Sequence, residues 1–287
     1  MQLTRDDRGP RDLLPWSRNL APLPRPVEEN HGHPPRRLAT DLAGTAFGLP
    51  AVSDEWVEWH RQYAADGMLS RRLKVVQDRL REALDRAPPG PIRLLSMCAG
   101  DGRDVLGALD CHPRRHEVRA RLVDLSPELS SAGRAEVSRR ELAGVEFVTG
   151  DASTTRAYAG IVPANVLLVC GVFGNISDSD IRNTIAHLPE LCAPDATVVW
   201  TRGRFEPDLT PTIRGWFSES GFAELSFVSI PETTASVGAH RLTARPRPFR
   251  PGVRLFTFLP KDERPSQRAK GPGSRSAAET RTAPGNC

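Results

Sequence analysis

The sequence predicts an α/β fold, with a doubly wound, mainly parallel β-sheet and a C-terminal antiparallel hairpin at its edge. Three observations support this prediction. Short apolar runs alternate with helix-like segments, which implies right-handed crossovers and helices on both faces of the sheet. The last two apolar runs have no helical pattern between them, so we expect them to pair antiparallel. The first apolar run leads into a glycine-rich turn, CAGDGRD, that precedes a helix.

The expected elements follow one another along the folded part of the chain. Two helices come first, over residues 54–67 and 71–87, with Ser53 and Ser70 as their N-caps. The expected strands cover residues 92–99, 117–126, 145–151, 165–172, 196–204, 222–230 and 253–260. Further helices are expected over residues 103–111, 127–142, 178–193 and 210–220.

We expect one folded domain between two disordered tails. Residues 1–52 contain many prolines without a lasting helical or strand period, and residues 261–287 contain no apolar side chain larger than alanine before the final cysteine. Such segments cannot bury enough surface to offset chain entropy. The folded domain, residues 53–260, is expected to begin with a helical lid.

Charge and cysteine usage exclude several classes of function. The net charge of +4 lies in the tails, and the region between them is neutral. A nucleic-acid enzyme usually concentrates positive charge on its folded surface, so no nucleic-acid partner is expected. The scattered cysteines form no CxxC pair, so we expect neither a metal site nor a disulfide framework. No apolar stretch approaches the roughly 20 residues that span a bilayer, and the N-terminus lacks a signal-peptide core. A cytoplasmic protein without membrane contact is therefore expected.

Polar or small residues end four of the predicted strands, where an open α/β sheet binds its ligand. Asp124 lies about 20 residues beyond the glycine turn, where a carboxylate can bind both ribose hydroxyls of a nucleoside. Asp151 ends the third strand and can accept a hydrogen bond from an adenine amine. Either aspartate alone could be a turn or cap residue. Their order and spacing together favour a nucleoside site.

Residues 92–203 resemble the class I S-adenosylmethionine-dependent methyltransferases, which have a Rossmann-like fold. CAGDGRD resembles their glycine-rich first motif, LVDLSPE the motif whose acid binds ribose, TGDA the motif at the adenine, and LLVCGVFGNISD the motif beside the methyl donor. The resemblance implies that S-adenosyl-L-methionine is the cofactor. It also implies that the cofactor-binding residues are Cys98, Ala99, Gly100, Asp101, Gly102, Asp124, Leu125, Asp151, Ala152, Cys170 and Gly171.

The chain departs from the family pattern at three positions. Cys98 replaces the usual first glycine, Ser96 replaces an acid that faces the donor's amino group, and Asn165 stands where the fourth motif often begins with aspartate. Asp101 and Asp104 are therefore candidates to contact the donor's ammonium group. Asp104 has a second interpretation, because an acid in the first turn of a helix also stabilises the helix dipole.

A small-molecule acceptor is expected, because the fourth motif lacks the [DN]PPY run of amino-group methyltransferases acting on nucleic acids or proteins. Two alternatives stay open: a methyltransferase acting on RNA or protein, and a relative that binds the donor without catalysis. A nicotinamide dehydrogenase is disfavoured, because its GxGxxG fingerprint would need glycine or alanine at Val105. The oligomeric state is not predicted.

Two histidines are the candidate catalytic residues. His240 lies in the long connection expected between the last two strands, over the ligand crevice. His60 shares one helix face with Trp56, Trp59 and Tyr63, which is typical either of a helix packed on the sheet or of an active-site lid. Arg202 and Arg204, at the end of the expected fifth strand, are candidates to bind an acidic acceptor.

Overall fold

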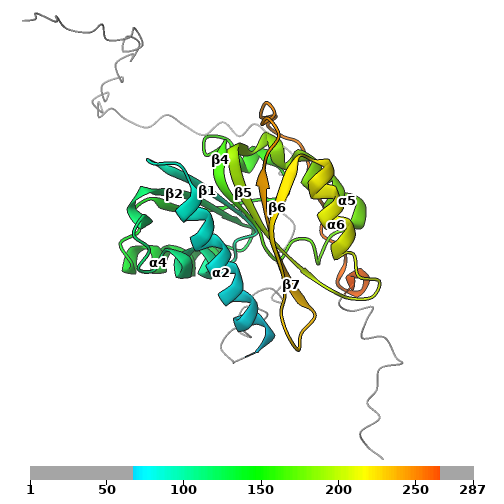
Figure 1. Ribbon diagram of the computed structural model, residues 1–287. Coiled ribbons are helices and arrows are strands. Elements are labelled where there is room, and N and C mark those ends of the chain that lie inside the picture. The colour runs from blue at the N-terminus through cyan, green and yellow to red at the C-terminus, as the bar shows by residue number, and fades with distance from the viewer. Residues whose placement is uncertain (1–66, 266–287) are drawn as a thin grey trace, which may run out of the picture. The chain divides into compact units, whose positions relative to one another are not determined.

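The computed structural model describes residues 67–265 of the chain, and a seven-stranded sheet forms its centre (Figure 1). The strand order is β3-β2-β1-β4-β5-β7-β6. The strands are β1 (Ile92–Met97), β2 (Val118–Asp124), β3 (Val145–Thr149), β4 (Ala164–Val169), β5 (Cys192–Gly203), β6 (Phe222–Ser229) and β7 (Ala235–Leu242). The helices are α2 (Met68–Arg86), α3 (Arg103–Leu109), α4 (Pro127–Arg139), α5 (Asp178–His187) and α6 (Thr210–Glu219). Short 3-10 turns lie at Arg115–Glu117, Thr155–Tyr158, Leu188–Glu190 and Lys261–Glu263.

The sheet confirms the predicted fold class. Strands β1 to β5 pair in parallel, whereas β7 pairs antiparallel with both β5 and β6. The strand order reverses at β1, because β2 lies on one side of it and β4 on the other. In an open α/β sheet the ligand crevice lies at this reversal, beyond the carboxyl ends of the strands.

Helices cover both faces of the sheet (Figure 1). Each face has its own apolar core. On one face, α2 and α3 pack against alternate strand residues such as Leu94 and Val199. On the other, α5 and α6 pack against the residues between them, such as Leu95 and Trp200. This alternation is the period of two that strand geometry imposes. Among residues 67–265, no helix has the length and apolar character needed to span a membrane.

Helix α2 begins three residues earlier than expected. Gly67 is its N-cap, and Ser70 lies in the first turn. The Ser70 hydroxyl donates to the Gly67 carbonyl at 2.8 Å and accepts from the Gly67 N–H at 3.0 Å, so it stabilises the start of the helix from within. The first predicted helix and the expected N-terminal tail lie almost wholly outside the described residues, as does most of the C-terminal tail.

The prediction for the edge hairpin was wrong about its second strand. The partner of β6 is β7, and the predicted strand over residues 253–260 is not part of the sheet. The β7 sequence ASVGAHRL resembles a loop because it has few large apolar side chains. The structure gives the reason. A Cβ on Gly238 would lie 2.3 Å from the Trp200 ring, so only a very small residue can lie beside this tryptophan.

Residues 243–260, which we call the C-terminal strap, follow β7 without forming a strand. Isolated bridges join Arg254 to Thr154 and Phe258 to Ile176. Leu255 is fully buried in the core on the α5 and α6 face. The apolar run that predicted a strand therefore packs beside the sheet, with loop residues as its partners.

Two neighbouring phenylalanines of the strap offer a test of this packing. Phe256 is 1% exposed and Phe258 is 38% exposed, with their rings 5.4 Å apart. Phe256→Ala should lower the free energy of unfolding by about 3–5 kcal/mol, because it empties a buried site. Phe258→Ala, the matched control, should cost well under half as much. Urea unfolding of both variants measures the difference, and equal losses would contradict this placement of the strap.

Candidate active site

The glycine-rich turn after β1 has an unusual backbone. Cys98, Gly100 and Gly102 all have positive φ angles, of 52°, 58° and 75°. A Cβ on Gly102 would lie 2.5 Å from the Phe147 ring. Glycine is therefore favoured there both by the positive φ angle and by the lack of space for a side chain. Cys98 adopts the left-handed conformation at a cost of about 1–2 kcal/mol. Strain of this kind is common at ligand sites.

Asp124, the last residue of β2, joins this turn to the start of α4. Its Oδ2 accepts from the Gly100 N–H at 2.7 Å, and its Oδ1 accepts from the Ser126 N–H at 2.9 Å. The N-cap of α4 is Ser126, whose hydroxyl accepts from the Leu129 N–H at 3.2 Å. Asp124 is therefore not the cap of this helix. An ionised carboxylate has about four acceptor positions, so each oxygen keeps capacity for a ligand hydroxyl.

Asp151 lies two residues beyond β3, beside the same turn. Its Oδ1 accepts from the N–H and the hydroxyl of Ser153, at 2.8 Å and 2.5 Å. Its Oδ2 lies 3.6 Å from Arg254 Nη2. Burial raises the pKa of the Cys98 thiol, and the carboxylates of Asp124 and Asp151 raise it further. The two predicted aspartates therefore converge on the Cys98 thiol, which stays neutral.

Two neighbours of these aspartates were also predicted as cofactor-binding residues. Leu125 is half-buried between Asp124 and the cap of α4. Ala152 is buried, and its carbonyl accepts a hydrogen bond from the Tyr158 hydroxyl. Ala99 donates its N–H to the Val123 carbonyl at 2.9 Å, which ties the glycine turn to β2.

The loop after β4 forms the next part of the same edge. Gly171 has a φ of 74°, and a Cβ there would meet no atom of residues 67–265 within 4 Å, so this backbone borders open space in the described part of the chain. The Gly171 N–H donates to Thr201 Oγ1 at 2.9 Å, and its carbonyl accepts from Asn175 Nδ2 at 2.7 Å. Burial raises the pKa of the Cys170 thiol, and nearby Asp104 raises it further.

The two arginines expected to bind an acidic acceptor both have structural contacts. Arg202 is 5% exposed and donates through Nη1 to the Phe173 carbonyl, which shapes the loop after β4. Burial lowers the pKa of Arg202, while nearby Asp178 and Asp208 raise it. Arg204 donates to the Thr233 carbonyl at 3.0 Å.

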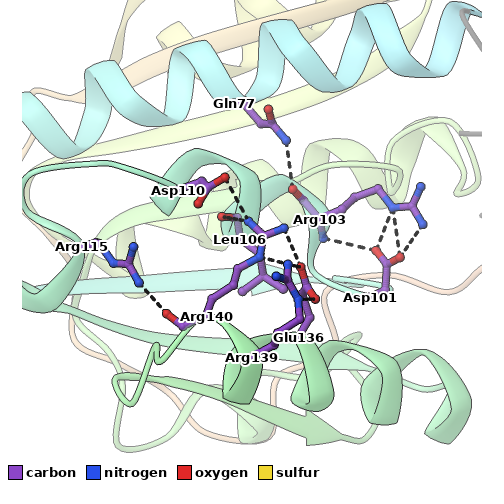
Figure 2. A network of polar contacts seen from close by, with 9 residues as sticks. All are labelled: Gln77, Asp101, Arg103, Leu106, Asp110, Arg115, Glu136, Arg139 and Arg140. Atoms are coloured by element: carbon purple, nitrogen blue, oxygen red, sulfur yellow. Dashed lines mark hydrogen bonds and ion pairs between the residues drawn. The ribbon is translucent and has the colours of Figure 1, made fainter. Parts of the chain in front are cut away.

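A polar network holds α3, and with it the end of the glycine turn, between α2 and α4 (Figure 2). Gln77 of α2 donates to the Arg103 carbonyl at 3.0 Å, and Arg140 beyond α4 donates to the Leu106 carbonyl at 3.1 Å. The predicted donor contact Asp101 is paired with the Arg103 side chain. Its charge is thus partly neutralised at the start of α3.

The structure corrects the position expected for His240. This residue lies within β7 and pairs with Val198, whereas the carboxyl end of β5 is Gly203. Its side chain is 1% exposed and stacks on Phe217 with ring centroids 4.3 Å apart. Trp200 Nε1 donates to His240 Nδ1 at 3.1 Å. His240 is therefore a buried core residue, away from the ligand crevice, and this position does not support its predicted role as a base. The other candidate, His60, lies outside the described residues.

A surface pocket of about 320 Å³ lies beside His240, between α6 and β6. It is lined by Arg214, Ser218, Phe222, Ala223, Glu224 and His240. Like His240, it lies away from the carboxyl ends of β1 and β4. Within residues 67–265, no group of three His, Cys, Asp or Glu side chains could hold a metal ion.

Sequence reasoning missed two residues of this edge. Arg254 comes from the strap and donates to Ser153 Oγ at 2.7 Å. Thr201 of β5 holds the Gly171 N–H. Neither has a local signal, because each reaches the site only through the tertiary fold.

Comparisons with known proteins concern the family and the fold of this chain. Residues 64–222 match a family model described as "Putative methyltransferase". No curated protein sequence matches the chain. The solved structure of magnesium protoporphyrin IX methyltransferase from Synechocystis PCC 6803, with bound SAM, matches with a TM-score of 0.50 and 13% identity, covering 68% of this chain and 99% of that chain. An O-methyltransferase family protein from Burkholderia thailandensis matches with a TM-score of 0.49 and 20% identity over 60% of this chain. The match spans 55% of that protein's length. At these identities the likeness concerns the fold.

The buried state of His240 predicts a pH dependence of stability. Burial lowers its pKa from 6.5 to about 4, although Glu224 opposes the shift. The unfolded chain therefore takes up this proton at a higher pH than the folded chain does. The free energy of unfolding therefore has its full value above pH 6.5 and decreases as the pH falls to 4, by about 3 kcal/mol in total.

His240→Asn is the matched variant, because its amide oxygen can still accept from Trp200 but does not titrate. The gap in unfolding free energy between the parent protein and this variant should shrink between pH 6.5 and 4. Urea unfolding across that range measures it. A gap that stays constant would show that His240 is not held neutral by burial.

Proposed function

This chain belongs to the methyltransferase family whose model it matches, and we propose that it methylates a small-molecule acceptor. Its fold is that of the class I methyltransferases, which take the methyl group from S-adenosylmethionine. It is accordingly an S-adenosylmethionine-dependent enzyme. The placement of the donor and the nature of the acceptor are the proposed parts.

The observation that most strongly supports the donor placement is the Asp124 carboxylate. It is bound to the glycine turn and to the start of α4, with both oxygens still able to accept. These residues fit a nucleoside, since a carboxylate at this position can bind two ribose hydroxyls. Cys98 to Gly102 would face the methionine end, Asp151 the adenine, and Gly171 the methyl group.

Positioning accounts for most of the chemistry that the chain must supply. The donor, when bound, supplies a methyl group on a sulfonium that is its own leaving group. The protein then has to align the acceptor atom with that methyl, which can lower the barrier by several kcal/mol. A general base is needed only if the acceptor must lose a proton. For that role His60 stays the candidate.

Three observations support a small acceptor. The loop after β4 reads Cys170-Gly171-Val172-Phe173, without the proline pair of amino-group methyltransferases. The region between the tails is neutral in net charge, unlike most nucleic-acid-binding surfaces. The open space beside Gly171 leaves room for an acceptor there. RNA or protein acceptors, and binding without catalysis, are the alternatives.

An isotopically labelled donor distinguishes these functions. The full chain is incubated with labelled S-adenosylmethionine and with small-molecule, RNA and protein fractions of a cell extract. We expect label in the small-molecule fraction. Label in RNA or protein would contradict the proposed acceptor class. Calorimetric binding of the donor without label in any fraction would favour a relative that binds and does not catalyse. Tighter binding of NAD than of S-adenosylmethionine would contradict the donor itself.

Asp124→Ala should weaken S-adenosylmethionine binding by about 1.5–3 kcal/mol, or ten- to a hundredfold, because charged hydrogen bonds to the ribose are lost. Asp124→Asn should lose less, since the amide keeps one acceptor. The matched control is Ser126→Ala, which removes the cap of α4 and should cost about 1 kcal/mol of stability while sparing affinity. Calorimetry and thermal melting together measure both effects. Affinity within twofold of the parent in Asp124→Ala would show that the ribose lies elsewhere.

A further inference from the structure

The C-terminal strap lies beyond the residues matched by the family model, which end at 222, yet it contacts the loop that holds Asp151. Leu255 donates its N–H to the Ser153 carbonyl at 2.7 Å. Two residues after Ser153, the Thr155 N–H donates to the Val253 carbonyl at 2.9 Å. Thr155 Oγ1 accepts from the Val253 N–H at 3.0 Å and donates to the Arg250 carbonyl at 2.6 Å. The strap is thus fixed along the loop after β3.

The same strap reaches the loop after β4. Leu259 donates its N–H to the Asn175 carbonyl at 2.8 Å, and Asn175 in turn holds the Gly171 carbonyl. Between these two loops, the Leu255 carbonyl accepts from Asn183 Nδ2 at 2.8 Å on α5. The strap therefore connects the loop proposed to face the adenine with the loop proposed to face the methyl group.

Arg254 is the strap residue that meets a candidate ligand-binding group. Its Nη1 donates to Ser153 Oγ at 2.7 Å, and its Nη2 lies 3.6 Å from Asp151 Oδ2. Ser153 already donates twice to Asp151 Oδ1. Among residues 67–265, Oδ2 accepts no hydrogen bond, so it stays available to a ligand donor.

A comparison with Arg250 indicates that Arg254 contributes less to anchoring the strap. Arg250 pairs bidentately with Glu190, whose side chain is only 2% exposed. Removing Arg250 would leave a buried carboxylate without its closest partner, which is costly. The Arg254 and Asp151 side chains are 59% and 36% exposed, and exposed ion pairs contribute little to stability.

We propose that Arg254 is a positioning residue for the donor's adenine. It holds Asp151 and Ser153 in the arrangement that aims Asp151 Oδ2 at the exocyclic amine. This inference rests on the proposed donor placement and adds to it a residue outside the matched family region. An amine donates to the carboxylate, whereas a 6-oxo group in its place would be repelled. Arg254 is thereby a determinant of selectivity for adenine over hypoxanthine.

Calorimetry with two probes tests the proposal: S-adenosylhomocysteine, and its deaminated analogue with hypoxanthine in place of adenine. In Arg254→Gln, the affinity for S-adenosylhomocysteine should fall about three- to tenfold. The preference for adenine over hypoxanthine should shrink by a similar factor. Arg254→Lys should recover part of both, since it restores the positive charge. Arg250→Gln, the matched control in the strap, should lower the melting temperature and leave affinity and preference unchanged.

Two results would overturn the proposal. The first is an Arg254→Gln variant with the affinity and base preference of the parent. The second is a variant that binds both probes more weakly by the same factor, because that indicates a general role in loop structure. A failure of the proposed function would look different, since the parent protein itself would then bind neither probe.

Discussion

The hydrogen bond between the Gly100 N–H and the Asp124 carboxylate is the interaction on which the candidate site depends. It joins the turn after β1 to the end of β2 at 2.7 Å, across the first two strands of the crevice. The turn can approach this carboxylate only because its backbone adopts positive φ angles at Gly100 and Gly102. The network around α3 then holds the far end of the turn (Figure 2). The site is thus preorganised by contacts within the fold.

Most of the fold could be predicted from local patterns. Alternating apolar and amphipathic segments located β1 to β6 and the helices α3 to α6, because periodicity and turn residues act over short distances. The pattern did not predict β7, because its small residues give no strand signal. Gly238 has to be small because Trp200 on the neighbouring strand fills the space beside it. The pattern also assigned a strand to residues 253–260, whose apolar side chains are buried beside the sheet.

The candidate site shows the same division. Asp124 and Asp151 could be located from the sequence, because each lies at or just beyond the carboxyl end of a predicted strand. Their partners could not all be found this way. Arg254 lies about a hundred residues further along the chain than Asp151, and only the path of the strap brings the two together. His240 was misplaced because its expected position depended on a hairpin whose second strand was wrongly assigned.

The place of β7 in the sheet bears on the order in which the protein can form during synthesis. Strand β7 lies between β5 and β6, although it is the last of the three to leave the ribosome. A nascent chain that ends at Ser229 contains all five parallel strands, but its β6 has no neighbour to pair with. The outer edge of β5 stays unpaired for the same interval. Unpaired strand edges favour contacts with other chains. Residues 235–242 therefore do more than complete the sheet, because their arrival closes two exposed edges at once.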